Sequence, residues 1–161
     1  MSSFKVDGHI KVLPILCPEP HCKSCKLKVC VHNKRLVKLL NNVIYTLPNG
    51  LIVIIKAGFI FDGASIPKWA WSIIGHPLSH KLIRFALLHD ALYASEYLPR
   101  HICDSFGRDF LRDFEKLCYA KYQTIYKAVD WFGGVVWRNH DTKSVYQARK
   151  FVTVIATEQN N

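Results

Sequence analysis

The residues best suited to chemistry in this sequence are the neighbours His89 and Asp90, followed by Tyr93 and, further along, Asp104. On a helix, His89 and Tyr93 lie four positions apart and share a face, whereas Asp90 is rotated by about 100° from His89. An imidazole with one nitrogen held by a carboxylate can take a proton from water with the other. The pattern therefore predicts His89 as a general base that Asp104, on the following helix, orients.

Asp90 needs a different partner because it points away from His89. Hard carboxylate oxygens favour calcium or magnesium over zinc, so Asp90 is a candidate ligand of a divalent cation. A structural alternative applies to the same residues, because paired polar side chains can simply fix the register of two helices. The flanking Leu87, Leu88 and Leu92 place the ionisable groups in apolar surroundings, where charge is penalised and partners are needed.

A second group of chemically competent residues lies near the amino terminus. Cys17, Cys22, Cys25 and Cys30 have the spacing C-x4-C-x2-C-x4-C. Four thiolates this close together could bind a tetrahedral zinc ion, which would stabilise a segment too short to build a core. Reduced thiols without a metal are the alternative, and disulfides are the least expected state, because Met1–Gly8 lacks the apolar core of a secretion signal.

The elements before the His-Asp pair are predicted to be strands. Pro48-Asn49-Gly50 separates two apolar runs, and because Asn and Gly tolerate positive φ, residues 43–56 are predicted to form a hairpin. Weaker strand patterns cover residues 9–16 and 35–40. Residues 34–67 are therefore expected to contain strands and a loop.

The elements from residue 79 onward are predicted to be helices. Apolar residues at three-to-four spacing indicate a first helix over residues 79–93 and a second that begins at Pro99. A third is predicted over 122–132, stopped by the two glycines that follow, and a last one over 143–157. The expected fold class is α+β, with a small antiparallel sheet in the N-terminal half and a three- to four-helix C-terminal half, 79–157, that carries the His-Asp centre.

Composition favours one domain over residues 1–161, because half of the residues are hydrophobic and the chain is too short for two ordinary cores. The net charge of +10 predicts attraction to anionic lipid surfaces or nucleic acid. Much of that charge lies in the N-terminal third, which includes a Cys-rich basic segment, 1–33. No apolar run approaches the roughly 20 residues of a spanning helix, so the chain is not expected to be transmembrane.

Several motifs together resemble domain-of-unknown-function family 1353, which occurs mainly in tailed bacteriophages and prophages. They are GFIFDGASIP at 58–67, HDALY at 89–93, Arg100, Asp104, Phe106 and WFGG at 131–134. The resemblance covers about residues 40–137. It implies a phage or prophage origin, packaging in the virion as an alternative location, and other phage structural proteins as partners. Location in the host cytoplasm is expected because no targeting segment is visible in the sequence.

The His-Asp-x-x-Tyr pattern is also similar to the active-site pattern of secreted and parvoviral phospholipases A2. That resemblance implies a divalent-cation-dependent hydrolase of lipid esters. In it, His89 would be the base for the attacking water, Asp90 a calcium ligand and Asp104 the group that orients His89. Tyr93 would donate a hydrogen bond to Asp104.

The phospholipase resemblance also implies a calcium-binding loop. The loop around Asp62 and Gly63 is the candidate for this role, although the usual glycine-rich calcium loop is not matched. Leu92 stands where the secreted enzymes have a disulfide cysteine. The sequence thus suggests two separate metal sites, one for calcium at Asp90 and the Asp62 loop and one for zinc at the N-terminal cysteines.

Two rival interpretations use the same residues. The segment Phe85–Asp90 also resembles the central motif of HD-type metal phosphohydrolases, with His76 or His80 as the upstream ligand. The other rival is a non-enzymatic virion, tail-assembly or host-interaction protein in which the His-Asp-Tyr cluster is purely structural.

Overall fold

The computed structural model describes residues 3–15, 36–62, 74–75 and 79–156. Within these residues two antiparallel sheets and four α-helices form the predicted α+β fold. The strands are β1 Lys5–Asp7, β2 Val12–Pro14, β3 Val37–Leu39, β4 Val43–Thr46, β5 Leu51–Ile55, β6 Ile60–Phe61 and β7 Val152–Ala156. The helices are α2 His80–Ser95, α3 Arg100–Asp109, the π-helix η2 Phe110–Phe114, α4 Tyr119–Arg138 and α5 Thr142–Arg149.

The larger sheet has the strand order β1-β4-β5-β7, and the smaller sheet has the order β2-β3-β6. Strands β4 and β5 form the predicted hairpin, with Tyr45 opposite Val53. Gly50 closes its turn with a φ of 82°, a conformation that glycine adopts without steric cost. Side chains along β4 alternate between buried and half-buried, so one face of this sheet supplies the core.

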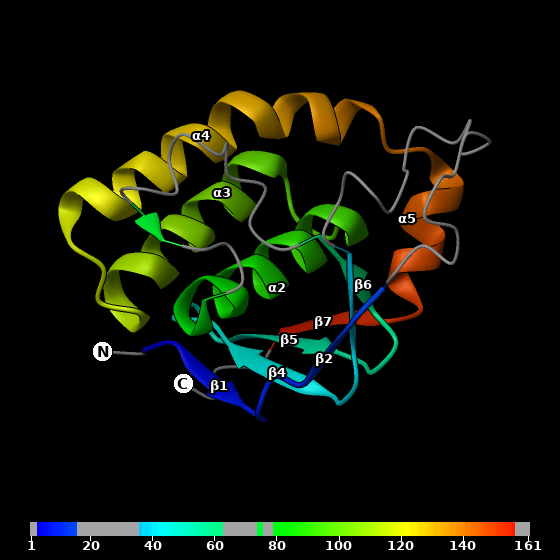
Figure 1. The fold of residues 1–161 in the computed structure, drawn as a ribbon. Coiled ribbons are helices and arrows are strands. Elements are labelled where there is room, and N and C mark those ends of the chain that lie inside the picture. The colour runs from blue at the N-terminus through cyan, green and yellow to red at the C-terminus, as the bar shows by residue number, and fades with distance from the viewer. Residues whose placement is uncertain (1–2, 16–35, 63–73, 76–78, 157–161) are drawn as a thin grey trace, which may run out of the picture.

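Helix α2 covers that buried face. The Tyr45 hydroxyl of β4 donates a hydrogen bond of 2.9 Å to the backbone oxygen of Arg84 in α2. Figure 1 shows α2 between the sheet and the outer helices α3 and α4. A central helix buries side chains on most of its surface, which explains why ionisable groups on α2 lie in an apolar interior.

A buried ion pair fixes the segment after α3 to α2. Glu115, only 3% exposed, accepts hydrogen bonds from the Arg84 guanidinium at 2.5 and 2.8 Å. The Lys81 ammonium donates to the Glu115 backbone oxygen at 3.0 Å. Because η2 joins α3 to Glu115, the ion pair between Arg84 and Glu115 also restrains α3, the helix that carries Asp104.

Three of the predicted element boundaries are wrong. The strand predicted over 9–16 is the shorter strand β2, Val12–Pro14, and the preceding strand β1, which belongs to the other sheet, was not predicted. Helix α4 runs through Gly133 and Gly134 to Arg138, because contacts with α3 and Tyr93 outweigh the low helix propensity of glycine. The helix predicted over 143–157 ends at Arg149.

The segment after α5 is the strand β7. Val152, Thr153, Val154 and Ile155 are β-branched, a side-chain type that suits a pleated sheet. They pair with β5, with Val154 opposite Val53. None of the helices in the described ranges combines the length and the apolar character that crossing a bilayer requires.

Candidate functional site

Helix α2 brings His89, Asp90 and Tyr93 to the wall of a cavity. His89 and Tyr93 lie on one face, with ring centroids 4.2 Å apart. Phe85, one turn earlier, stacks on the other side of the imidazole at 5.4 Å. Apolar and aromatic neighbours on both sides hold the His89 ring in one orientation.

Asp104 of α3 accepts hydrogen bonds from both α2 side chains. His89 Nε2 lies 3.0 Å from Asp104 Oδ1, and the Tyr93 hydroxyl donates to the same oxygen. The Asp104 carboxylate is only 4% exposed. The structure thus brings together the three residues that the sequence proposed as base, orienting acid and tyrosine.

Arg100 extends this network to α4. Its Nε atom lies 3.4 Å from Asp104 Oδ2 and 3.3 Å from the Tyr93 hydroxyl. Its Nη2 atom donates to Asp130 Oδ1 at 3.0 Å and to the Asp130 backbone oxygen. The polar network therefore joins α2, α3 and α4.

The charges in the network stabilise one another. Burial alone would lower the pKa of His89, but the hydrogen bonds and negative charges of Asp104 and Asp90 outweigh burial and raise it above 6.5. Burial would raise the pKa of Asp104, but the hydrogen bonds from His89 and Tyr93 lower it below 3.8. Asp104 is therefore an ionised acceptor that favours the imidazolium form of His89.

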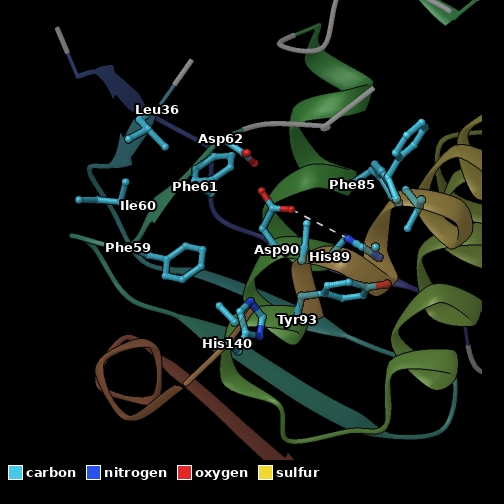
Figure 2. Close-up of a pocket in the computed structure, with 15 residues that line it drawn as sticks. Leu36, Phe59, Ile60, Phe61, Asp62, Phe85, His89, Asp90, Tyr93 and His140 are labelled. Atoms are coloured by element: carbon cyan, nitrogen blue, oxygen red, sulfur yellow. Dashed lines mark ion pairs between the residues drawn. The ribbon is translucent and has the colours of Figure 1, made fainter. Parts of the chain in front are cut away.

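The other nitrogen of His89 faces Asp90. Nδ1 lies 3.9 Å from Asp90 Oδ1, which is the ion pair drawn as a dashed line in Figure 2. Because Asp104 engages Nε2, a neutral His89 carries its proton there and has an unprotonated Nδ1 on the side of Asp90. This is the tautomer that a general base requires.

Two carboxyl groups meet beside this nitrogen. Figure 2 shows Asp62, which directly follows β6, pointing toward Asp90. Burial and the adjacent Asp62 raise the pKa of Asp90 to about 7. Asp90 Oδ2 is buried and has no hydrogen-bond partner among the described residues.

The cavity has a volume of about 270 Å³ and is mostly apolar. Aromatic rings and aliphatic side chains from β6, α2 and α4 form its walls, and a few polar groups converge on it. The apolar lining includes Leu36, Phe59, Ile60, Phe61, Phe85, Ala94, Val129, Phe132 and Val136, and the polar lining includes Asp62, His89, Asp90, Tyr93 and His140. Such a lining suits a ligand with an apolar chain and one polar reacting group.

Two glycines allow the helices to approach the site closely. A Cβ atom at Gly133 would lie 2.5 Å from the Tyr93 hydroxyl, and one at Gly107 would lie 2.8 Å from Phe85 Cε2 and 3.2 Å from His89 Cδ2. Neither position has room for a methyl group unless the neighbouring ring shifts. The WFGG motif thus positions Tyr93 instead of ending α4.

His140 is a cavity residue that the sequence patterns did not single out. Its Nδ1 atom lies 2.9 Å from Glu96 Oε1. Glu96 ends α2 in the left-handed conformation, with a φ of 48°. The spacing of Val129, Phe132 and Val136 places these three on one face of α4, whereas His140 follows the end of the helix and carried no helical signal.

Other predicted residues do not join this site or lie outside the described ranges. Gly63, His76 and the four N-terminal cysteines, Cys17, Cys22, Cys25 and Cys30, are outside those ranges. His80 lies 3.2 Å from Arg84 Nη1 and does not line the cavity. In the portions of the chain that are described, no three His, Cys, Asp or Glu residues cluster as a metal site.

The family model for a protein of unknown function, DUF1353, matches residues 37–129, more than half of the chain. The chain belongs to the DUF1353 family. The DUF1353 match begins at β3 and ends within α4, so it contains His89, Asp90, Tyr93 and Asp104. No curated protein and no solved structure matches the chain.

Proposed function

We propose that this DUF1353 protein is a hydrolase that cleaves carboxylic esters of lipids, with His89 as the general base. One observation carries the proposal: Asp104 holds Nε2 of His89 at 3.0 Å, while Nδ1 faces Asp90 and both His89 and Asp90 line the cavity. A fixed imidazole at a cavity wall is the arrangement that activates a water molecule.

The reaction follows from this arrangement. His89 Nδ1 accepts a proton from water as the water oxygen bonds to the ester carbonyl carbon. Asp104 stabilises the imidazolium that forms, and Tyr93 and Arg100 keep Asp104 in place. When the bond between the carbonyl carbon and the alcohol oxygen breaks, the imidazolium returns the proton to the leaving oxygen, which gives an alcohol and a carboxylic acid that then loses its proton to solvent.

Asp90 and Asp62 fit a divalent cation. Hard carboxylate oxygens suit calcium, and two facing carboxyl groups with an unpartnered oxygen, Asp90 Oδ2, form an electronegative site inside an apolar cavity. A cation held there would supply positive charge near the oxygen that becomes negative during ester cleavage.

The apolar walls favour a lipid over a small polar ester. Phe59, Phe61 and Phe132 offer contact area for an acyl chain, and the polar groups gather around His89. The net charge of +10 also favours substrates in anionic surfaces.

The test is ester hydrolysis by the purified full chain. The substrates are a soluble short-chain nitrophenyl ester and phosphatidylglycerol vesicles, each with calcium or with a chelator. His89→Gln should lower turnover about 10²- to 10⁴-fold. His80→Gln is the matched control, since His80 is an exposed histidine of the same helix and should leave turnover unchanged. Wild-type protein without ester turnover would exclude this function.

A non-enzymatic phage assembly or host-interaction protein is the second candidate. The network from His89 through Asp104 and Arg100 to Asp130 favours it, because the network fastens three helices together. In that case no ester is cleaved, and His89→Gln lowers the melting temperature by about 5 °C or more. Cleavage of a phosphodiester in the same assay would instead favour the HD-type phosphohydrolase.

A further inference from the structure

The C-terminal half of α4 exposes an unusually apolar surface. Single exposed apolar residues are common on proteins, but adjacent ones on a single helix mark a binding surface. We call these four residues the α4 apolar face: Trp131, 75% exposed, Phe132, 50%, Val135, 53%, and Val136, 48%.

Helix geometry makes this face continuous. Trp131 and Val135 are four positions apart and form one row, and Phe132 and Val136 form the neighbouring row. Figure 1 shows α4 on the outer side of the helical layer, away from the sheet. The face therefore lies where a large partner can reach it.

The α4 apolar face adjoins the opening of the cavity. Phe132 and Val136 both line the cavity and are exposed on the surface. Ile60 of β6, 50% exposed, lines the cavity as well. Apolar surface thus continues from outside the protein toward His89, so a partner on α4 would lie beside the route that a substrate takes.

Positive charges flank the face at both ends. Lys127 lies one turn before Trp131, and Arg138 lies three positions after Val135; both side chains are exposed. The acidic neighbour Asp130 is paired with Arg100 at 3.0 Å. An apolar centre with cationic ends complements a surface that has an apolar interior and anionic headgroups.

The same charges disfavour a second copy of the chain as the partner. In a two-fold symmetric dimer the same patch lies on both subunits, which would place the cationic ends of two α4 helices at one interface. Each chain also carries a net charge of +10, which adds repulsion over a longer range.

We propose that the α4 apolar face docks the protein on an anionic phospholipid surface, with Lys127 and Arg138 at the headgroups and Trp131 at the boundary with the acyl chains. Tryptophan favours this boundary because its ring is apolar and its N–H is polar. The choice of lipid as the partner rests on the proposed function. Docking would bring the cavity opening to the lipid, so an ester could enter without crossing water.

The experiment measures binding separately from turnover. All variants are made in a His89→Gln background and sedimented with vesicles of phosphatidylglycerol or phosphatidylcholine. The double variant Trp131→Ser/Val135→Ser should bind phosphatidylglycerol vesicles at least about tenfold more weakly. Tyr119→Ser, at the other end of α4 and 72% exposed, is the control and should bind normally.

A second double variant, Lys127→Gln/Arg138→Gln, tests the contribution of the positive charges to vesicle binding. At about 1 kcal/mol for each cation, binding to phosphatidylglycerol should weaken about 30-fold, while binding to phosphatidylcholine should not change. The chain has four tryptophans, so subtracting the emission of the Trp131→Phe variant isolates the expected blue shift of Trp131.

The outcomes separate this proposal from the proposed function. Unchanged vesicle binding by Trp131→Ser/Val135→Ser overturns the docking surface, and so does a concentration-dependent dimer that the same substitutions dissociate. Failure to hydrolyse the soluble ester overturns the enzyme but leaves vesicle binding by the His89→Gln protein intact. With His89 restored, Trp131→Ser/Val135→Ser should keep soluble-ester turnover and lose vesicle turnover.

Discussion

Gly133 lies directly against the Tyr93 hydroxyl, with space for a hydrogen atom but not for a methyl group. Tyr93 donates from that position to Asp104, the residue that holds His89. A backbone position on α4 thus controls the geometry of a side-chain pair contributed by α2 and α3.

Gly133→Ala should therefore lower the free energy of unfolding by about 2 kcal/mol, because the added methyl group forces Tyr93 away from Asp104. Gly134→Ala is the control. Its Cβ atom would lie 3.1 Å from Arg100 Nη1, a contact that a small shift of this long side chain relieves, and alanine favours the helix by about 1 kcal/mol. Urea denaturation measures the free energy of unfolding of both variants. Equal stabilities would contradict the close packing of Gly133 against Tyr93.

Asp104→Asn should reduce kcat about 100-fold and change KM by less than about threefold, since Asp104 acts on His89 and does not line the cavity. Asp109→Asn is the matched control, because Asp109 is also on α3 but pairs with Arg108 and Arg112. Steady-state kinetics on the soluble ester would show whether kcat falls while KM stays nearly constant. An equal loss in both variants would assign Asp104 a structural role alone.

The pH dependences of stability and activity should run in opposite directions. The pKa of His89 is raised above 6.5, so its pairing stabilises the folded protein fully below pH 6.5 and less as pH rises through the higher folded value. Ester hydrolysis needs neutral His89 and should increase about tenfold per pH unit below that pKa. Chemical denaturation measures the stability, and initial rates measure the activity, from pH 5.5 to 8.5. Rates that fall as pH rises across this range would exclude His89 as the base.

Asp90 adds to the same stability trend. Its pKa is raised to about 7, so the folded state binds more protons than the unfolded state, and stability falls as pH rises from about 4 to 7. In a chelator, Asp90→Asn should therefore gain about 2 kcal/mol of stability at pH 8 relative to wild type. Denaturation curves at pH 5 and pH 8 would show the gain, and an equal effect at both values would contradict it.

Calcium should stabilise the folded protein through Asp90. At 100 times the dissociation constant the gain is about 2.7 kcal/mol, which raises the melting temperature by about 5–10 °C. Asp90→Asn should abolish the shift, and Asp113→Asn, an exposed acid on η2, should retain it. A calcium shift that survives Asp90→Asn would place the cation elsewhere.

The four N-terminal cysteines should bind one zinc ion per chain. Elemental analysis of the purified protein should find zinc in the wild type and lose it in Cys22→Ser/Cys25→Ser, because thiolates are its strongest ligands. Cys118→Ser removes an exposed cysteine of the C-terminal half and should retain the metal. Full zinc content in the double variant would exclude this cluster.

The sequence was sufficient to predict which side chains meet at the His89 centre. Helical spacing predicted the shared face of His89 and Tyr93, and the short connection to the next helix indicated Asp104 as the partner of His89. The hydrogen bond between Tyr93 and Asp104 was implied by the phospholipase resemblance. The facing of Asp62 and Asp90 was suggested by the phospholipase resemblance, since periodicity carries no information about how a strand end meets a helix. Arg100 was visible in the family motif, but its link to Asp130 depends on how α4 packs.

The missed features share a physical cause. Gly133 and Gly134 were interpreted as a helix end because glycine is a poor helix former, and only the packed Tyr93 ring reveals why glycine is required there. Ending the predicted helix at residue 132 removed Val136 from the cavity-facing row of α4. Similarly, β7 has a strand pattern too short to outweigh the helical segment before it, and only its pairing with β5 defines it.

The pairing of β5 with β7 has a consequence for biosynthesis. Val53 and its partner Val154 are about 100 residues apart, so β5 emerges from the ribosome long before the strand that covers it. Until then, β5 presents an open edge of unpaired backbone groups and apolar side chains. A polypeptide interrupted before Val152 would keep that edge exposed and should aggregate or be degraded, even though every residue of the His89 network has already been made.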